Sequence, residues 1–324
     1  MYFPSGTHRI TKTIDVPDGT TVCGDGPGTM LVSSVNPVFR VRGAIDVVFR
    51  DFSLEVEYSG KNYTTGIHFQ NSSNGTQCED CVVENVRFAL SERPEPGHTH
   101  MGILANHCSG LRVTGCLSHH MQFVLASGQD RTPVTDVSVT GCRFIDPFNF
   151  ACSFVGDEPT DTLSGFLFQG NIIEGIASSG GVFIGSDGET KHVGHLSHIH
   201  VKDNIFRGEW GPKAFSAVQV TLASTSRDIQ ITGNSIANEG VKVNNSYGIG
   251  VIAPRAGATL AGCHISGNSA MNMDLEGVRA HVAVGRISGL WVCDNDLRGT
   301  RGLMVYGEQW DVFEHGNLTK NGVE

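Results

Sequence analysis

The chain has 324 residues, of which 41 are glycine and 17% are charged, and its formal net charge is −10. The negative charge argues against nucleic acid as a partner, because binding to phosphates requires a basic surface. No run of residues approaches the roughly 18 apolar residues of a membrane-spanning helix, so we expect no membrane insertion. High glycine content with few charges is typical of β structure that is rich in turns.

The N-terminal segment consists of short apolar runs divided by turn residues. Residues 3–7 read FPSGT, residues 14–22 read IDVPDGTTV and residues 24–26 read GDG. Residues 1–9 would leave an open strand edge, and residues 1–6 contain no basic and apolar signal sequence. Either a cap and a signal precede residue 1 or the chain starts abruptly, and the first alternative is favoured.

The rest of the chain repeats one unit of about 30 residues. Each unit has an alternating apolar strand, such as Gly181–Ile184, a polar turn, and a second strand, such as Ile199–Val201, that is closed by Gly or Asp and then Asn. The closing position is predicted at Phe52, Asn85, Cys116, Cys142, Asn171, Asn204, Asn234, Asn268 and Asn295. Alternation buries one face of a strand, and this period matches a coil of a parallel β-helix better than a propeller blade. We therefore predict nine to ten coils.

The closing asparagine is predicted to occupy a turn and to form a ladder. Asparagine tolerates left-handed backbone angles, and identical amides stacked about 4.8 Å apart can bond to one another. Cys116 and Cys142 are interpreted as thiols in the same inward-facing position. The nine cysteines cannot all pair, and the parallel side chains of Cys116 and Cys142 would often miss the torsion of a disulfide, so reduced thiols are expected. Cys78 and Cys81 form a single C-x-x-C without the second half of a zinc site, so zinc is not expected there.

The N-terminal pattern and the later repeats resemble pectate-lyase-like right-handed β-helix proteins over nearly the whole chain. This resemblance implies an all-β fold, a right-handed single-stranded parallel β-helix, with one domain spanning residues 1–324. The superfamily includes polysaccharide lyases, glycoside hydrolases, epimerases and phage tailspikes, and fold alone does not select an activity. The resemblance further implies a secreted or extracellular protein with a polysaccharide or oligosaccharide partner. It leaves open a homo-oligomer, in particular a trimer.

Candidate site residues follow from stacking, because successive coils place residues about 30 apart in sequence next to each other. The first outward column of the first strands is predicted to read His68, Leu104, Val124, Ser153, Phe183, Gln219, Gly250, Ala283 and Met304. At the strand exit, Asp157 and Asp187 share a register in adjacent coils. Two carboxylates so close can act as an acid and base or bind a hard cation such as Ca²⁺.

The rim where the chain enters the first strands collects further candidates. His119, His120 and Lys213 are the catalytic candidates of this rim. Trp210 and Tyr247 are predicted as stacking platforms for sugars and Arg279 as a carboxylate contact, with Gln219 and His68 as further substrate-binding residues. Asp146-Pro147-Phe148 matches only the first two residues of the Asp-Pro-His motif of alginate epimerases, and it is interpreted as a turn.

Two classes of function remain open at this point. The first is a carbohydrate-active enzyme that cleaves glycosidic bonds, either by elimination next to a uronic acid through Lys213, Arg279 and the histidines, or by hydrolysis through Asp157 and Asp187. The second is a non-catalytic glycan-binding or tailspike-like β-helix, with sugar-binding aromatics but no tuned acid and base.

Overall fold

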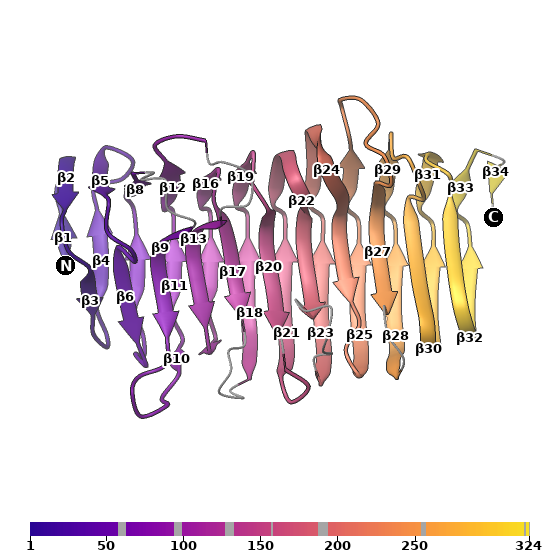
Figure 1. Ribbon diagram of the computed structural model, residues 1–324, viewed down its shortest axis with the longest axis horizontal. Helices are drawn as coiled ribbons and strands as arrows, with labels where there is room; N and C mark the ends of the chain where they lie inside the picture. Colours follow the sequence, from indigo (N-terminus) through magenta and orange to yellow (C-terminus); the bar gives the residue numbers. More distant parts are fainter. Residues whose placement is uncertain are drawn as a thin grey trace.

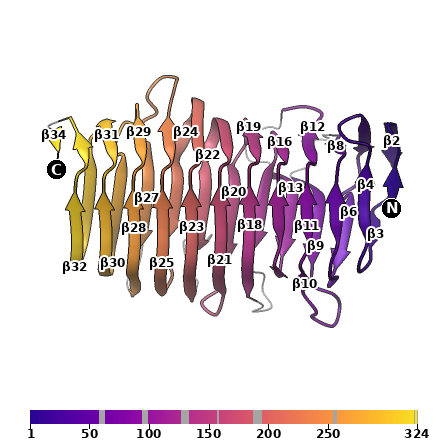
Figure 2. The ribbon, with the colours of Figure 1, turned by 180° about the vertical axis from the view of Figure 1, so that it is seen from behind.

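The computed structural model describes residues 1–57, 63–93, 99–126, 133–156, 158–186, 194–253, 257–320 and 322–323. These residues form an elongated stack of strands with the two termini at opposite ends (Figure 1). The same single stack is seen from behind (Figure 2). No helix long and apolar enough to cross a membrane occurs in these ranges.

Each coil of the chain passes through three parallel sheets. The first sheet is made of the first strands of the sequence repeat, and from its N-terminus the chain enters the second sheet, then the third and then the first. The first sheet contains β3 (Ile14–Val16), β6 (Phe39–Arg42), β9 (Tyr63–Gln70), β13 (Thr99–Asn106), β17 (Gln122–Ala126), β20 (Phe150–Gly156), the second half of β22 (Ile172–Ser186) and of β24 (Ile205–Thr221), β27 (Tyr247–Ala253), and the first half of β30 (Val278–Cys293) and of β32 (Leu303–His315).

The second sheet contains β1 (Tyr2–Phe3), β4 (Thr21–Gly24), β7 (Val48–Arg50), β10 (Cys78–Glu79), β11 (Val82–Glu84), β14 (Cys108–Ser109), β15 (Arg112–Thr114), β18 (Val134–Thr140), β21 (Thr162–Gln169), β23 (His195–Lys202), β25 (Thr225–Thr232), β28 (Ala258–Ser266) and the second halves of β30 and β32. The long strands run through a corner and so belong to two sheets.

The third sheet contains β2 (Gly6–Ile10), β5 (Thr29–Ser33), β8 (Ser53–Val56), β12 (Arg87–Leu90), β16 (Leu117–His119), β19 (Arg143–Ile145), the first halves of β22 and β24, β26 (Ser235–Ala237), β29 (Ser269–Met271), β31 (Asp296–Gly299) and β33 (Leu318–Thr319), to which β34 (Gly322–Val323) adds an antiparallel edge. The described strands therefore stack at more levels than the nine to ten predicted. The predicted closing positions omitted the levels of β1 and β4, whose turns lack the closing asparagine, and the C-terminal level closed by Asn317.

The core is a continuous apolar column between the sheets. Its largest fully buried side chains are mostly phenylalanines that repeat from level to level: Phe39, Phe49, Phe52, Phe69, Phe88, Phe123, Phe144, Phe154, Phe166, Phe168 and Phe206. Edge-to-face contacts link several of them, as between Phe123 and Phe144, whose ring centres lie 4.9 Å apart. The alternation seen in the sequence thus buries one face of each strand, as predicted.

The asparagine ladder is confirmed from Asn171 onward and extends one level further than predicted, to Asn317. The side-chain amide of Asn204 donates to Oδ1 of Asn234 at 2.9 Å and to the backbone oxygen of Phe168 at 3.0 Å. The same arrangement recurs at Asn234, Asn268 and Asn295. The amides face the interior of the helix and are almost fully buried, so the ladder stabilises the fold.

The ladder asparagine was predicted to be the left-handed residue of this turn. In the structure the residue before it has the left-handed backbone instead. That position is held by Asp51, Asn85, Gly115, Gly141, Gly170, Asp203, Gly233, Gly267, Asp294 and Gly316, all with positive φ. Asn85 was therefore misassigned: its side chain is exposed, and Val86 occupies the buried position between Phe52 and Cys116. The error arose because Asn85, like the true ladder residues, follows an alternating apolar strand.

All nine cysteines are free thiols in this structure. Cys116 and Cys142 fill the inward-facing position of the ladder, as predicted, and Cys142 donates its backbone N–H to Oδ1 of Asn171 at 2.8 Å. Cys78 and Cys81 are fully buried. Burial raises the pKa of the Cys116 thiol and of the Cys152 thiol, so both groups stay protonated and inert.

Candidate functional site

The outward face of the first sheet carries the column that the sequence predicted, with one correction. Phe183, Gln219 and Gly250 are register neighbours on β22, β24 and β27. The next position belongs to Arg279 rather than to Ala283, because β30 begins its pairing with β27 at Val278. The apolar run Val282–Val284 alternates like a first strand, which is why the pattern placed the strand four residues too late. This shift brings Arg279 into the column.

Gln219, Tyr247 and Arg279, all predicted as substrate-binding residues, lie together on this face. The Tyr247 hydroxyl donates to Oε1 of Gln219 at 3.0 Å, and the Arg279 guanidinium carbon lies 5.9 Å from the centre of the Tyr247 ring. Burial raises the pKa of Tyr247 to about 12, so its hydroxyl stays protonated and remains a donor. The Nε of Arg279 is buried, and no described residue accepts a hydrogen bond from it.

His281 lies two residues beyond Arg279 on β30 and therefore points to the same outward face. It is the register neighbour of Tyr306 on β32, and the two rings meet edge to face with centres 5.1 Å apart. Burial, and then the positive charge of Arg279, lowers the pKa of His281, so the imidazole is neutral at pH 7. Tyr306 is 56% exposed. A neutral base, a phenol and an arginine thus share two neighbouring levels.

A row of aromatic rings leads along this face toward Tyr247. Phe150 stacks on Phe183 with ring centres 4.9 Å apart and meets Phe215 edge to face at 6.0 Å. Phe215 lies 6.4 Å from Tyr247. Phe150 and Phe215 are partly exposed, whereas Phe183 is buried. Partly exposed aromatic faces beside polar groups are suited to the apolar faces of sugar rings.

Tyr247 itself is only 6% exposed, so the prediction that it offers an open stacking platform is wrong. Its ring lies over Gly250, where an added Cβ would stand 2.4 Å from Cε2 of the ring. Trp210 is likewise not a platform: it is 3% exposed and packs into the core at the corner of β24. Trp210 is held at the bend of a long strand, whereas Tyr247, the first residue of β27, is held by its packing over Gly250 and its hydrogen bond to Gln219. Alternation reveals neither feature.

His68 belongs to the same column but lies at its N-terminal end. Five strand spacings separate it from Gln219, roughly 24 Å along the stack. Its Nε2 lies 3.5 Å from the side-chain nitrogen of Asn106. Burial, and then the charges of Arg40 and Arg42, lowers the pKa of His68 to about 4. It is not brought together with Gln219, Tyr247 or Arg279.

Lys213 is exposed on β24 opposite Ser178 of β22. No contact among the described residues joins it to His119 or His120, whose strand lies three levels away. Asp157 and Asp187, the predicted acid–base or Ca²⁺-binding pair, lie outside the described residues. Their roles stay predictions.

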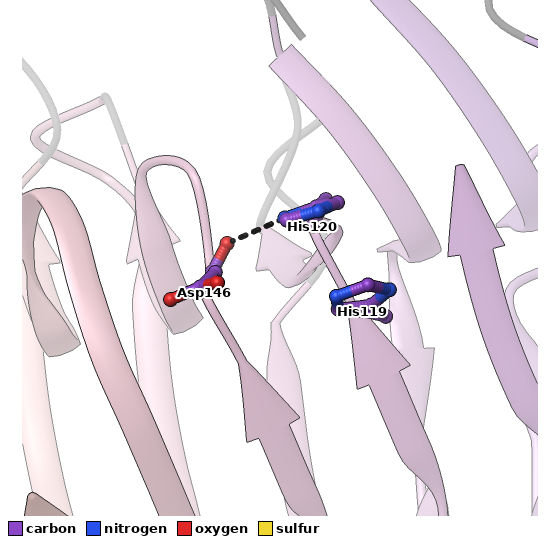
Figure 3. A group of neighbouring side chains, drawn as sticks. All are labelled: His119, His120 and Asp146. Carbon is purple, nitrogen blue, oxygen red and sulfur yellow. Dashed lines mark hydrogen bonds between the residues drawn. The ribbon is translucent and has the colours of Figure 1, made fainter. Parts of the chain in front are cut away.

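The structure does bring His119 and His120 together with a third residue, Asp146 (Figure 3). The two imidazole rings stack with centres 3.9 Å apart, at the corner between the third and first sheets. His120 Nδ1 lies 3.3 Å from the backbone oxygen of Asp146. One nitrogen of each histidine and one carboxylate oxygen of Asp146 all lie within 4.8 Å of one another.

Sequence reasoning missed Asp146, His281 and Tyr306 as site residues. Asp146 comes directly after β19, and His120 comes directly after the neighbouring strand β16. An alignment of the turns as well as the strands would therefore have placed Asp146 beside the histidines. His281 and Tyr306 were not placed side by side, because the register of β30 was misplaced by four residues. Phe183 was predicted in the outward column, but its contacts with Phe150 and Phe215 were not, because these two residues do not share its register position.

No protein-family model matches the sequence, and no curated protein matches it. Solved structures are similar in fold. A mannuronic acid-specific polysaccharide family 6 lyase from the human gut microbiota matches with a TM-score of 0.60 and 12% identity, covering 98% of this chain and 76% of the lyase.

Two further solved structures belong to other classes. The tailspike protein of E. coli bacteriophage HK620, as a double mutant in complex with a pentasaccharide, matches with a TM-score of 0.57 and 14% identity over 91% of this chain and 63% of the tailspike. PfbA, a surface adhesin of Streptococcus pneumoniae, matches with a TM-score of 0.53 and 12% identity over 100% of this chain and 86% of the adhesin. The chain is therefore a parallel β-helix protein with the pectate-lyase-like fold, as the sequence predicted.

Proposed function

We propose that this protein binds an acidic polysaccharide along the outward face of the first sheet and cleaves it by β-elimination next to a uronic acid. The observation that carries the proposal is the grouping of Arg279, His281 and Tyr306 on two neighbouring levels, with the buried Nε of Arg279 left without an acceptor among the described residues. No ion pair joins Arg279 to a carboxylate among the described residues, and a guanidinium in this state suits a carboxylate ligand.

Each group has a role in the elimination. Arg279 binds the uronate carboxylate and withdraws electron density from it, which makes the proton on C5 more acidic. The neutral imidazole of His281 takes that proton, the electrons of the C5–H bond form the C4–C5 double bond, and the bond from C4 to the glycosidic oxygen breaks. The Tyr306 hydroxyl donates a proton to the leaving oxygen. His281 and Tyr306 then exchange a proton through solvent, and no water is consumed.

Tyr247 and Gln219 act as positioning residues in this scheme. Tyr247 supports the guanidinium of Arg279 through a cation–π contact, and Gln219 fixes the Tyr247 hydroxyl. Phe150 and Phe215 extend the surface toward neighbouring sugar units of the polymer.

The fold comparisons support the class of substrate. One similar structure is named as a lyase specific for mannuronic acid, which is a uronic acid, and another was solved with a bound pentasaccharide. At 12–14% identity these comparisons concern the fold, so the residue roles rest on the geometry of this chain alone.

The test is a panel of uronate polysaccharides, such as alginate and polygalacturonate, with neutral polysaccharides as controls. Ultraviolet absorbance of unsaturated uronides and release of reducing ends are followed together. We expect both signals on one uronate polymer, and Arg279→Gln and His281→Gln should lower kcat/KM by about 10²–10⁴. Arg298→Gln and His264→Gln, exposed residues of the third and second sheets, should leave it unchanged. Reducing ends without absorbance would instead indicate hydrolysis.

Glycan binding without catalysis is the second candidate, and one observation favours it. On the second sheet, Trp291 stacks on Phe313 with ring centres 4.2 Å apart, and both rings are exposed, by 42% and 45%. This aromatic pair lies apart from Arg279 and His281. Binding to a polymer of the panel that Trp291→Ala abolishes, with neither absorbance nor reducing ends, would favour this candidate.

A further inference from the structure

One position in the turn between the third and first sheets has a left-handed backbone, which glycine adopts most readily, yet two levels carry other residues there. At successive levels this position is occupied by His120, Asp146, Gly175 and Gly208, with φ of 60°, 45°, 71° and 92°. Left-handed angles are cost-free for glycine but unfavourable for other residues. His120 and Asp146 thus keep a less favourable backbone at two adjacent levels, and their side chains converge there with His119.

The surroundings of Asp146 leave room for its carboxylate. A Cβ at position 175 would overlap Oδ1 of Asp146, so the glycine at this position lets the carboxylate lie across the next level. The carboxylate takes part in no ion pair with lysine or arginine among the described residues, unlike Glu174 on the adjacent strand, which bridges Arg143 and Arg207.

The histidines are in a state that can bind a metal. With Nδ1–H of His120 donating to the backbone oxygen of Asp146, the lone pair of its Nε2 is free, which is the arrangement that orients metal-binding imidazoles. His119 also lines a cavity of about 290 Å³ together with Glu55 and Arg87, so one side of the cluster is open to a small molecule.

We propose that His119, His120 and Asp146 form a binding site for a divalent transition-metal ion, Zn²⁺ in particular. Two imidazole nitrogens and one carboxylate oxygen are a donor set typical of zinc sites that keep a fourth position open, whereas Ca²⁺ prefers oxygen donors alone. Donor atoms bound tetrahedrally to one zinc ion lie roughly 3.4 Å apart. The donor atoms now lie within 4.8 Å of one another, so metal binding requires side-chain rotations that bring them closer and unstack the two rings.

The experiment is a calorimetric titration of the full chain, freed of metal with a chelator, with Zn²⁺ alone, and a parallel titration with Co²⁺ followed by absorption. We expect one ion per chain and a Co²⁺ spectrum without thiolate charge-transfer bands. His120→Gly should weaken Zn²⁺ binding at least tenfold and abolish the rise in Tm that Zn²⁺ produces. Because glycine suits the left-handed backbone, this variant removes the ligand without straining the fold.

Two matched controls make the result specific. His198→Gly removes another left-handed histidine, with φ of 55°, and Asp136→Gly removes a left-handed aspartate, with φ of 56°, to be compared with Asp146→Gly. Both controls should bind Zn²⁺ as the unchanged chain does. Unaltered affinity in His120→Gly and Asp146→Gly, thiolate bands with Co²⁺, or no binding by the unchanged chain would each overturn the proposal.

Discussion

The guanidinium carbon of Arg279 lies 5.9 Å from the centre of the Tyr247 ring, and the ring lies over Gly250, the register neighbour of Arg279. One glycine therefore determines where a tyrosine lies, and the tyrosine supports the arginine. The outward position of Gly250 followed from the repeat, but the pattern gives no indication of what covers it.

Gly250→Ala is expected to displace the Tyr247 ring. The added Cβ would stand 2.4 Å from Cε2, so ring or strand must move, at a cost of about 1–3 kcal/mol in the free energy of unfolding. Urea denaturation measures this, and binding of the uronate polymer should weaken as Arg279 loses its support. Gly28→Ala is the control, since its nearest neighbouring atom, Oγ of Ser5, would lie 3.8 Å from the Cβ. A Gly250→Ala variant as stable as the control would contradict this packing.

Asn204→Ala is expected to lower the free energy of unfolding by roughly 2–5 kcal/mol without changing the outward face. Oδ1 of Asn204 accepts hydrogen bonds from the backbone and the side chain of Asn171, and these buried donors would lose their partner. Asn244→Ala, at an exposed residue, is the control and should change stability by less than about 0.5 kcal/mol. Equal stability of both variants in urea would show that the ladder contributes nothing.

The fold was predictable because its determinants are periodic. Alternating strands of about 30-residue period give the sheets, and the asparagines from Asn171 to Asn295 give the ladder. Errors arose where one local pattern fits two registers: Asn85 and Val86 compete for one position, and Val278 and Val282 compete as the start of a strand.

The candidate site was predictable only in part. Gln219 was selected by its place in the outward column, and Tyr247 and Arg279 by residue type and rim position, and the three do lie together. The burial of Trp210 depends on a bend within the long strand β24, and that of Tyr247 on its packing over Gly250, and a period reveals neither. Asp146 appeared as an isolated turn because its neighbours His119 and His120 are 26 or more residues away in sequence.

Stability is expected to fall as the pH is lowered from about 6.5 to about 4, in part because of His68. The folded chain keeps this imidazole unprotonated down to about pH 4, whereas the unfolded chain binds the proton near pH 6.5. The contribution is fully present above pH 6.5 and is lost as the pH falls through this window. It is on the order of 2–3 kcal/mol, since His68 is largely buried.

Urea denaturation of His68→Gln at several pH values checks this. The variant should lose stability less steeply than the unchanged chain between pH 6.5 and 4, because glutamine does not titrate. His195→Gln, which removes an exposed imidazole, should follow the unchanged chain. Parallel curves for His68→Gln and the unchanged chain would show that His68 is not the group responsible.

Arg279→Gln is expected to raise the pKa of His281. In the unchanged chain, burial lowers this pKa first, and the like charge of Arg279 lowers it further by disfavouring the imidazolium. Removing the arginine charge leaves only the burial, so His281 should bind its proton at a higher pH than before but still below an exposed histidine. Salt should raise the pKa in the unchanged chain by screening Arg279 and have little effect in the variant. Following the His281 ring proton by NMR across the pH range measures both effects without requiring a substrate, and Arg298→Gln, on the third sheet, is the charge-matched control. If His281 titrates at the same pH with and without Arg279, the two groups do not share a site, and His281 is not the neutral base that the elimination needs.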